Sequence, residues 1–269
     1  MSNPVFYATP QQLAGLGPGS LFTLDGAEGR HATTVKRLEP GEPVDMCDGA
    51  GVRLVCTVTS AGKGVLTVRV ESVHQEPSPA ISFTLVQALA KGDRDELAIE
   101  TATELGIDTV VPWQAERSIV RWKMDKALKG PEKWRQVVGA AAKQARRSTI
   151  PQVSSLAGTA QVCELIAGAG LALILHEDAT DSVAEVARSW FAAQQGAHEG
   201  EAAQAGKTAG PPAGSIVMIV GPEGGMSTAE VAAFVAAGAR TALLGHHVLR
   251  SSTAGPAAVV VLSQELGRW

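Results

Sequence analysis

Alternating apolar and polar positions characterise the first part of the chain. The alternation is clearest in 52–58 (VRLVCTV) and 66–70 (LTVRV), where a period of two predicts half-buried β-strands. Turn signals separate the runs: Pro40-Gly41, Asp48-Gly49 and Gly62-Lys63-Gly64. We therefore expect a small β-barrel or meander over 1–74. The segment 75–80, which contains two prolines and no apolar periodicity, is the expected linker.

From residue 81 onward, short apolar runs alternate with stretches of helical periodicity. The apolar runs, which predict buried strands, are 81–89, 107–113, 171–175, 216–220 and 241–245. In the stretch 93–106, Asp93 and Glu96 predict a capping box and Gly106 predicts the helix end. The alternation predicts an α/β fold with a parallel sheet and flanking helices over 81–269.

The segment 132–147 is expected to form an amphipathic helix with a basic outer face. Its core face consists of Trp134, Val137, Val138, Ala141, Ala142 and Ala145. The basic residues expected to point away from the core are Arg135, Lys143, Arg146 and Arg147.

The segment 192–214 is rich in Ala, Gly, Gln and Pro and contains no large apolar residue, which predicts a flexible surface insertion. It includes GKT at 206–208, the final three residues of a phosphate-binding P-loop. That motif requires glycine at position 201, where the chain has Glu201, and a strand leading into it. Hydrolysis of ATP or GTP is therefore not expected.

The composition indicates a globular protein without a membrane span or disulfides. The 269 residues are 45% hydrophobic, the first residues do not resemble a signal peptide, and no apolar run approaches the about 18 residues of a membrane span. Cys47, Cys56 and Cys163 are far apart, so we expect neither disulfides nor a zinc site, and a cytoplasmic location.

The formal net charge of −4 conceals a basic segment. Between Arg117 and Arg147, ten Lys and Arg residues accompany only two acids, Asp125 and Glu132. Such a segment is typical of a nucleic-acid-binding surface, and equally of a solvated helical face.

Three irregular loops follow three of the predicted strands. They are HEDATD at 176–181, GPEGGMSTAE at 221–230 and LGHHVLRSSTAGP at 244–256. Ligands of open α/β sheets bind beyond the carboxyl ends of strands, so the loops predict one site. The second loop does not match the dinucleotide fingerprint, but Gly224 and Gly225 allow close approach of a ligand, and Ser227 with Glu230 predicts a capping box.

Neither a metal site nor a serine nucleophile is expected at these loops. His176, His246 and His247 lack a partner carboxylate at a usual ligand spacing, so no metal site is predicted. Ser251 and Ser252 are not in the context of a serine nucleophile.

The loops at 221–230 and 244–254 resemble the closing motifs of the SPOUT methyltransferases. More specifically, the chain resembles the ribosomal RNA small subunit methyltransferase E family, which methylates N3 of a uridine in 16S ribosomal RNA. Three further blocks in the same order extend the likeness over nearly the whole chain: 31–51 resembles the family's N-terminal PUA-like RNA-binding barrel, 91–118 its first α/β unit, and 133–153 its basic helix.

The resemblance implies a C-terminal trefoil knot, a homodimer, and S-adenosylmethionine bound in the knot. The substrate would be a uridine of the decoding region in the assembled small ribosomal subunit. The cofactor site would use Leu175, His176, Gly221, Glu223, Gly224, Gly225, Leu244, Gly245, Val248, Leu249, Arg250, Thr253 and Ala254. Backbone amides and carbonyls would bind the adenine edge within apolar walls.

Methyl transfer to N3 requires in-line placement and stabilisation of a uracil anion. Arg250 is the candidate for that stabilisation, and Glu223 is a second catalytic candidate. Pairing of Arg250 with a carboxylate such as Glu223, to hold the knot closed, is the alternative role. The family usually has Arg at His247, Glu at Ser252 and Cys at Ser118, so no general base is assigned.

Basic residues are the candidates for RNA contact. They are Arg30, His31, Lys36, Arg37, Lys91, Arg94, Arg117, Arg121, Arg146 and Arg147. Aromatic residues are only 4% of the chain, which favours structured RNA over stacked single strands. Two alternatives to the leading function stay open: a SPOUT methyltransferase acting on tRNA or another rRNA nucleotide, and a non-catalytic RNA-binding assembly factor.

Overall fold

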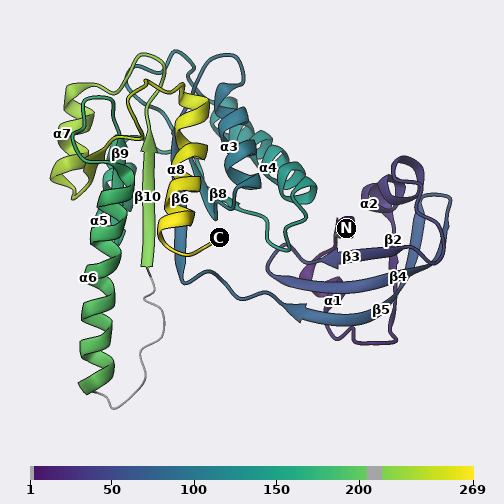
Figure 1. The fold of residues 1–269 in the computed structure, drawn as a ribbon. Helices are drawn as coiled ribbons and strands as arrows, with labels where there is room; N and C mark the ends of the chain where they lie inside the picture. Colours follow the sequence, from purple (N-terminus) through teal and green to yellow (C-terminus); the bar gives the residue numbers. More distant parts are fainter. Residues whose placement is uncertain (1–2, 205–213) are drawn as a thin grey trace. The chain divides into compact units, whose positions relative to one another are not determined.

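The computed structural model describes residues 3–204 and 214–269 and divides into two compact units (Figure 1). The first unit comprises Met1–Ser78 together with Gly139–Ile150. The second comprises Pro79–Val138 and Pro151–Trp269. The inclusion of Gly139–Ile150 in the first unit was not predicted from the sequence.

The first unit contains a five-stranded sheet in the order β1-β3-β4-β5-β2. Its strands are β1 (Val5–Tyr7), β2 (Leu21–Leu24), β3 (Pro43–Cys47), β4 (Val52–Gly62) and β5 (Val65–Gln75). Strands β1 and β3 are parallel, and the other pairs are antiparallel. The short helices α1 (Pro10–Leu13) and α2 (Gly26–Arg30) and a π-helical turn, η1 (His31–Val35), complete the strand connections.

The alternation in β4 and β5 places one set of side chains in the core of this unit. Leu54, Leu66 and Val68 are fully buried, and Phe6 and Met46 join the same apolar cluster. Burial of this apolar face is the main term that stabilises the sheet.

The segment Gly139–Ile150 is fixed to the first unit by polar contacts. The Lys143 ammonium lies 2.7 Å from a Glu28 carboxylate oxygen and 4.5 Å from the centre of the Phe6 ring. The Tyr7 hydroxyl donates to the Arg147 carbonyl at 2.8 Å, and the Ser148 hydroxyl donates to Glu76. The expectation that Lys143 points away from the core is therefore wrong: its side chain is only 16% exposed, because Glu28 and Phe6 supply a charge partner and an apolar surface.

The second unit contains a six-stranded, all-parallel sheet in the order β11-β9-β10-β6-β7-β8. Its strands are β6 (Ile81–Ala88), β7 (Thr109–Trp113), β8 (Gln152–Val153), β9 (Leu171–Leu175), β10 (Gly214–Val220) and β11 (Arg240–Ala242). Its helices are α3 (Arg94–Glu104), the first part of α4 (Asp125–Gln144), α5 (Thr159–Ala167), α6 (Val183–Gln204), α7 (Thr228–Ala236) and α8 (Ser251–Glu265). The α/β prediction is confirmed for this unit.

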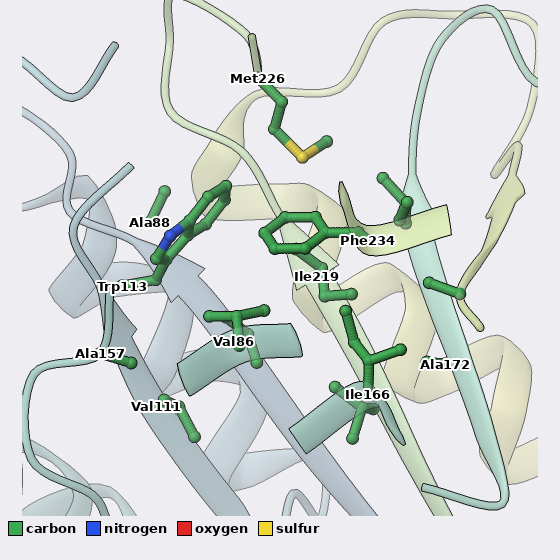
Figure 2. Packing of buried hydrophobic residues seen from close by; sticks show 14 of the residues in the cluster. Val86, Ala88, Val111, Trp113, Ala157, Ile166, Ala172, Ile219, Met226 and Phe234 are labelled. Atoms are coloured by element: carbon green, nitrogen blue, oxygen red, sulfur yellow. The ribbon is translucent and has the colours of Figure 1, made fainter. Parts of the chain in front are cut away.

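Helices cover the sheet on both sides. Figure 2 shows the cluster in which the Trp113 and Phe234 rings meet edge to face, with centroids 5.2 Å apart and Met226 beside them. Residues of α5 and α7 close this side. On the other side α8 packs against β6 and β10, so closely that a Cβ on Gly255 would lie 2.9 Å from a Leu85 methyl carbon.

The predicted capping box at Asp93 is wrong. Asp93 adopts a left-handed conformation, with φ of 58°, and makes no side-chain cap hydrogen bond. An N-cap side chain reaches the first turn from an extended backbone, which this conformation does not provide. Glu96 forms an ion pair with Lys133 instead. Helix α3 ends at Glu104, and Gly106 follows in a positive-φ conformation as expected.

The prediction of a flexible insertion over 192–214 is also wrong in part. Helix α6 continues to Gln204, because Ala, Gln and Glu are favourable helix formers even where large apolar residues are missing. The GKT at 206–208 lies outside the described residues. None of the helices in the described part of the chain is both long and apolar enough to span a membrane.

The capping box that begins α7 is confirmed and is buried. Ser227 and Glu230 exchange hydrogen bonds of 2.9 and 3.2 Å, and the second Glu230 oxygen accepts the Glu116 amide at 2.7 Å. Glu230 is 4% exposed, and its carboxylate accepts both the amide of the buried Ser227 and the amide of Glu116. Ser182 and Glu185 form the same reciprocal pair at the exposed start of α6.

Glu230→Ala should lower the free energy of unfolding by about 2 to 3 kcal/mol, because the amides of Ser227 and Glu116 lose a buried, charged acceptor. Glu185→Ala is the matched control and should have a much smaller effect, since water replaces its bonds. Urea denaturation followed by circular dichroism measures both. Equal effects of the two substitutions would contradict the role given to burial.

Candidate functional site

Three loops at the carboxyl ends of neighbouring strands enclose a cavity of about 450 Å³ in the second unit. The loops follow β9, β10 and β11, and β9 lies between the other two in the sheet. The lining residues are Arg94, Leu175, His176, Glu177, Val220, Gly221, Pro222, Glu223, Gly225, Met226, Ala242, Leu243, Leu244, Gly245, His247, Val248, Leu249, Arg250, Ser251 and Ala254. Its volume is in the usual range for small-molecule sites.

Two glycines of the β10 loop occupy positions that disfavour a side chain, Gly225 because of its backbone conformation and Gly221 because of its neighbour Met226. Gly225 has φ of +71°, and its amide closes a turn by donating to the Pro222 carbonyl at 2.9 Å. A Cβ on Gly221 would approach the Met226 side chain to 3.0 Å. Arg117 braces the loop by donating to the Gly224 and Met226 carbonyls at 3.4 and 3.3 Å.

Glu223 connects the β10 loop to the loop before α3. One of its carboxylate oxygens accepts the Lys91 amide at 2.9 Å and the Arg94 guanidinium at 3.2 Å. The alternative in which Arg250 pairs with Glu223 is therefore wrong. Glu223 pairs with Arg94 instead, and Arg250 forms no ion pair with another described residue.

The loop after β11 leaves its backbone donors available. No amide between residues 244 and 252 donates a hydrogen bond to any group in the described part of the chain. Val248 is 75% exposed, and Leu249 is also exposed. Free amides next to apolar side chains are suited to a flat heteroaromatic ligand.

His176 is held by the backbone of this edge. Its amide donates to the Ala242 carbonyl at 3.1 Å, and its Nδ1 accepts the Asp178 amide at 3.2 Å. Among the side chains described, those of residues 3–196 and 214–269, no three or more of His, Cys, Asp or Glu form a group that could hold a metal ion.

The structure brings most of the predicted cofactor residues together. All except Gly224 and Thr253 line the cavity: Gly224 faces Arg117, and the Thr253 amide donates to the Arg250 carbonyl. The sequence analysis did not include Arg94 and Ser251 among them. Each is the first residue of a helix, α3 and α8 respectively. This position could have identified them, because ligand sites of parallel α/β proteins often use helix N-termini.

The residues predicted to contact RNA lie in both units. In the second unit, Arg117 and Arg121 donate to backbone carbonyls, Arg94 lines the cavity, and the Lys91 amide binds Glu223. In the first unit, Arg30 and Arg37 line a hollow of about 490 Å³ that also includes Lys63. Lys36 is exposed nearby, and the Arg146 carbonyl accepts from Arg53.

His31 is not a free RNA contact. Its Nδ1 lies 3.1 Å from the Lys143 ammonium, and its ring packs edge-on against Phe6. Burial, and then the charge of Lys143, lower the pKa of His31 below its ordinary value of 6.5. Trp134 is buried in the core as expected, Trp113 is buried as well, and Trp122 meets Trp134 with ring centroids 5.6 Å apart.

Family models match both parts of the chain. A model described as RNA methyltransferase domain matches residues 76–263, and one described as RNA methyltransferase PUA domain matches residues 24–71. The ribosomal RNA small subunit methyltransferase E of Mycobacterium tuberculosis is 40% identical over 255 residues, which cover 93% of this chain and 89% of the relative. The protein of that name in Bacillus subtilis is 28% identical over 245 residues, which cover 91% and 90%.

Two solved methyltransferase structures are similar to nearly the whole chain. Ribosomal RNA small subunit methyltransferase E from Neisseria gonorrhoeae, bound to S-adenosyl methionine, has 25% identity and a TM-score of 0.75, with 98% of each chain covered. A Legionella pneumophila methyltransferase in complex with the same cofactor has 26% identity and a TM-score of 0.77, also with 98% of each chain covered.

The charge of Lys143 should be measurable at His31. Because the pKa of His31 is lowered on folding, its neutral form contributes stability that is lost as the pH falls below 6.5. In a proton NMR titration, the pKa of His31 should lie below 6.5 and should rise in Lys143→Met, where the repelling charge is gone. His31→Gln assigns the resonance, and an unchanged pKa in Lys143→Met would contradict the assignment of the cause.

Proposed function

Because the chain belongs to the ribosomal RNA small subunit methyltransferase E family, we propose that it transfers a methyl group from S-adenosylmethionine to N3 of one uridine in the decoding region of 16S ribosomal RNA. The cavity at the ends of β9, β10 and β11 is the observation that carries this proposal. The cofactor supplies an electrophilic methyl group on a sulfonium, and the protein supplies binding, orientation and charge.

The residues of the cavity fit this cofactor. The free amides of 244–250 are donors for the edge of an adenine ring, and Leu175, Val248 and Leu249 offer apolar contact to its faces. The glycines at 221 and 225 allow backbone to approach the ligand without a phosphate being involved. Gly224 and Thr253 do not line the cavity, so in this proposal they only position the residues next to them that do.

Glu223 acts as a positioning residue in this proposal rather than as a base. Its carboxylate already accepts the Lys91 amide and the Arg94 guanidinium, and these bonds fix the β10 loop against the start of α3. Removal of Glu223 would therefore loosen the cavity wall. A general base for N3 stays unassigned.

Arg250 is proposed to stabilise the anion that develops on the uracil ring. It lines the cavity, and its guanidinium forms no ion pair with a described residue. A permanently charged, planar donor in this position can bind a carbonyl oxygen of the deprotonated base, onto which the negative charge is delocalised, and leaves the lone pair of N3 for the methyl group.

The basic residues support RNA as the substrate. Arg121 in the second unit and Arg30, Lys36 and Arg37 in the first would contact phosphates, which position RNA but do not read its sequence. The homodimer and the trefoil knot implied by the family stay predictions.

Incubation with labelled S-adenosylmethionine and small ribosomal subunits that lack the modification should yield labelled 3-methyluridine, detected by nucleoside analysis. Another methylated nucleoside, or methylation of tRNA instead, would refute the substrate. Titration calorimetry comes first: if the cofactor does not bind, a non-catalytic RNA-binding factor becomes the better description.

Arg250→Lys should reduce kcat by about 10² to 10³-fold, because the planar fork that meets the developing charge is lost. Cofactor affinity, measured by calorimetry, should stay within about threefold. His246→Gln is the control, since His246 is in the same loop and does not line the cavity. Near-normal turnover of Arg250→Lys would remove Arg250 from catalysis.

A further inference from the structure

The hollow of about 490 Å³ on the first unit lies between two turns of the chain. One is the turn between β4 and β5, and the other is η1 with the residues that precede and follow it. All lining residues come from 30–39 and 61–64. They belong to the first unit, so the hollow is separate from the cavity at the ends of β9, β10 and β11.

Close packing of the backbone holds these two turns together. A Cβ on Gly29 would lie 2.6 Å from the Leu24 carbonyl oxygen and would also strike the Gly64 carbonyl. A Cβ on Gly64 would lie 2.9 Å from the Arg30 Cγ. The Thr33 hydroxyl donates to the Gly29 carbonyl at 2.9 Å. The walls of the hollow are therefore fixed by contacts within the unit.

The hollow is lined by three exposed cationic side chains, those of Arg30, Arg37 and Lys63. None of the three forms an ion pair with a described residue, because the ion pairs of this unit use other cations, namely Arg53, Arg69 and Lys143. Glu39 is the one acid among the lining residues. Three cations against one acid leave the hollow positively charged and accessible to an anion.

Two of these cations occupy backbone positions that favour other residues. Lys63 and Gly64 have φ of 54° and 79°, as a two-residue type I′ turn requires, and Asn, Asp or Gly is usual at the first position of that turn. Arg37, with φ of 53°, follows the end of η1, where glycine commonly ends a helix. Such left-handed residues lower stability and are concentrated at binding sites. Both of these line the same hollow.

We propose that this hollow is one binding site for phosphate groups of the RNA substrate, with the side chains of Arg30, Arg37 and Lys63 as donors. Several unpaired cations on a concave surface suit a polyanion, whose neighbouring phosphates attract cations strongly. The match to the RNA methyltransferase PUA domain, over residues 24–71, includes every lining residue and favours RNA over an acidic protein. The inference rests on the proposed function and deepens it: the first unit would bind RNA at a built site rather than through evenly spread charge.

Lys63→Asn tests the site without weakening the fold, because the turn itself favours asparagine. Its urea midpoint of unfolding should equal or exceed that of the wild type. In filter binding to small ribosomal subunits that lack the modification, the Kd should rise about tenfold, the scale of a lost hydrogen bond to a charged group. The slope of log Kd against log salt concentration should fall by about one, as for one lost phosphate contact. Lys63→Gly, which also suits the turn, should give the same result, and Lys63→Arg should restore binding.

Arg69→Ala is the matched control. It removes one positive charge from an exposed position on β5, in the same sheet but outside the hollow. The Kd should change less than about twofold, since an exposed, paired charge contributes little. In steady-state methylation, Lys63→Asn should raise KM for the subunits about tenfold and leave the calorimetric Kd for S-adenosylmethionine unchanged, because Lys63 does not line the cofactor cavity.

The inference is overturned if Lys63→Asn and Arg69→Ala change the Kd for subunits equally, as evenly spread charge predicts. It is also overturned if Lys63→Arg binds as weakly as Lys63→Asn, since charge would then not be the cause. Failure of the proposed function gives a different result: no 3-methyluridine forms, while the Kd for subunits still depends on Lys63.

Discussion

Parallel pairing of β10 between β9 and β6 is the constraint on which the cavity depends. All strands of the sheet run in one direction, so the segments that follow β9, β10 and β11 must leave from the same edge. The register aligns Met218 with Leu173 and with Leu85, which brings the ends of these strands to a similar level. A site at this edge is therefore a consequence of strand order, before any side chain is considered.

Long-range polar contacts then fix the loops that the sheet brings together. Glu223 binds the start of α3, Arg117 binds two carbonyls of the glycine loop, and Glu230 binds the Glu116 amide. Each contact joins segments more than 100 residues apart in sequence. Because charged groups bond to backbone atoms here, the loops can keep a defined shape at the surface of the unit.

Much of this arrangement could be predicted from local pattern. The continuous apolar runs at 171–175 and 216–220 identified two central strands, and the loops that follow them identified the site. Strand β1, with three residues, is too short to show any period. The composition of 192–204 resembled a loop, although its residues also favour a helix.

Other features depend on partners that no local pattern reveals. Lys143 meets Glu28 across 115 residues of sequence, and Asp93 has a left-handed backbone at the position where a helix cap was predicted. The cations of the hollow on the first unit, from 30–39 and 61–64, likewise come together only when β5 packs against α2 and η1.

The chain passes between the two units three times, after Ser78, after Val138 and after Ile150. The sheet of the first unit is complete by Gln75, but Glu28 and Glu76 reach Lys143 and Ser148 only when the chain has extended far beyond that point. During synthesis the N-terminal sheet therefore forms before Lys143 and Ser148 are available. Glu28 and Glu76 lack these partners until about half of the protein has left the ribosome. A gene fragment ending at the apparent linker would encode the strands of this unit without the segment that completes them.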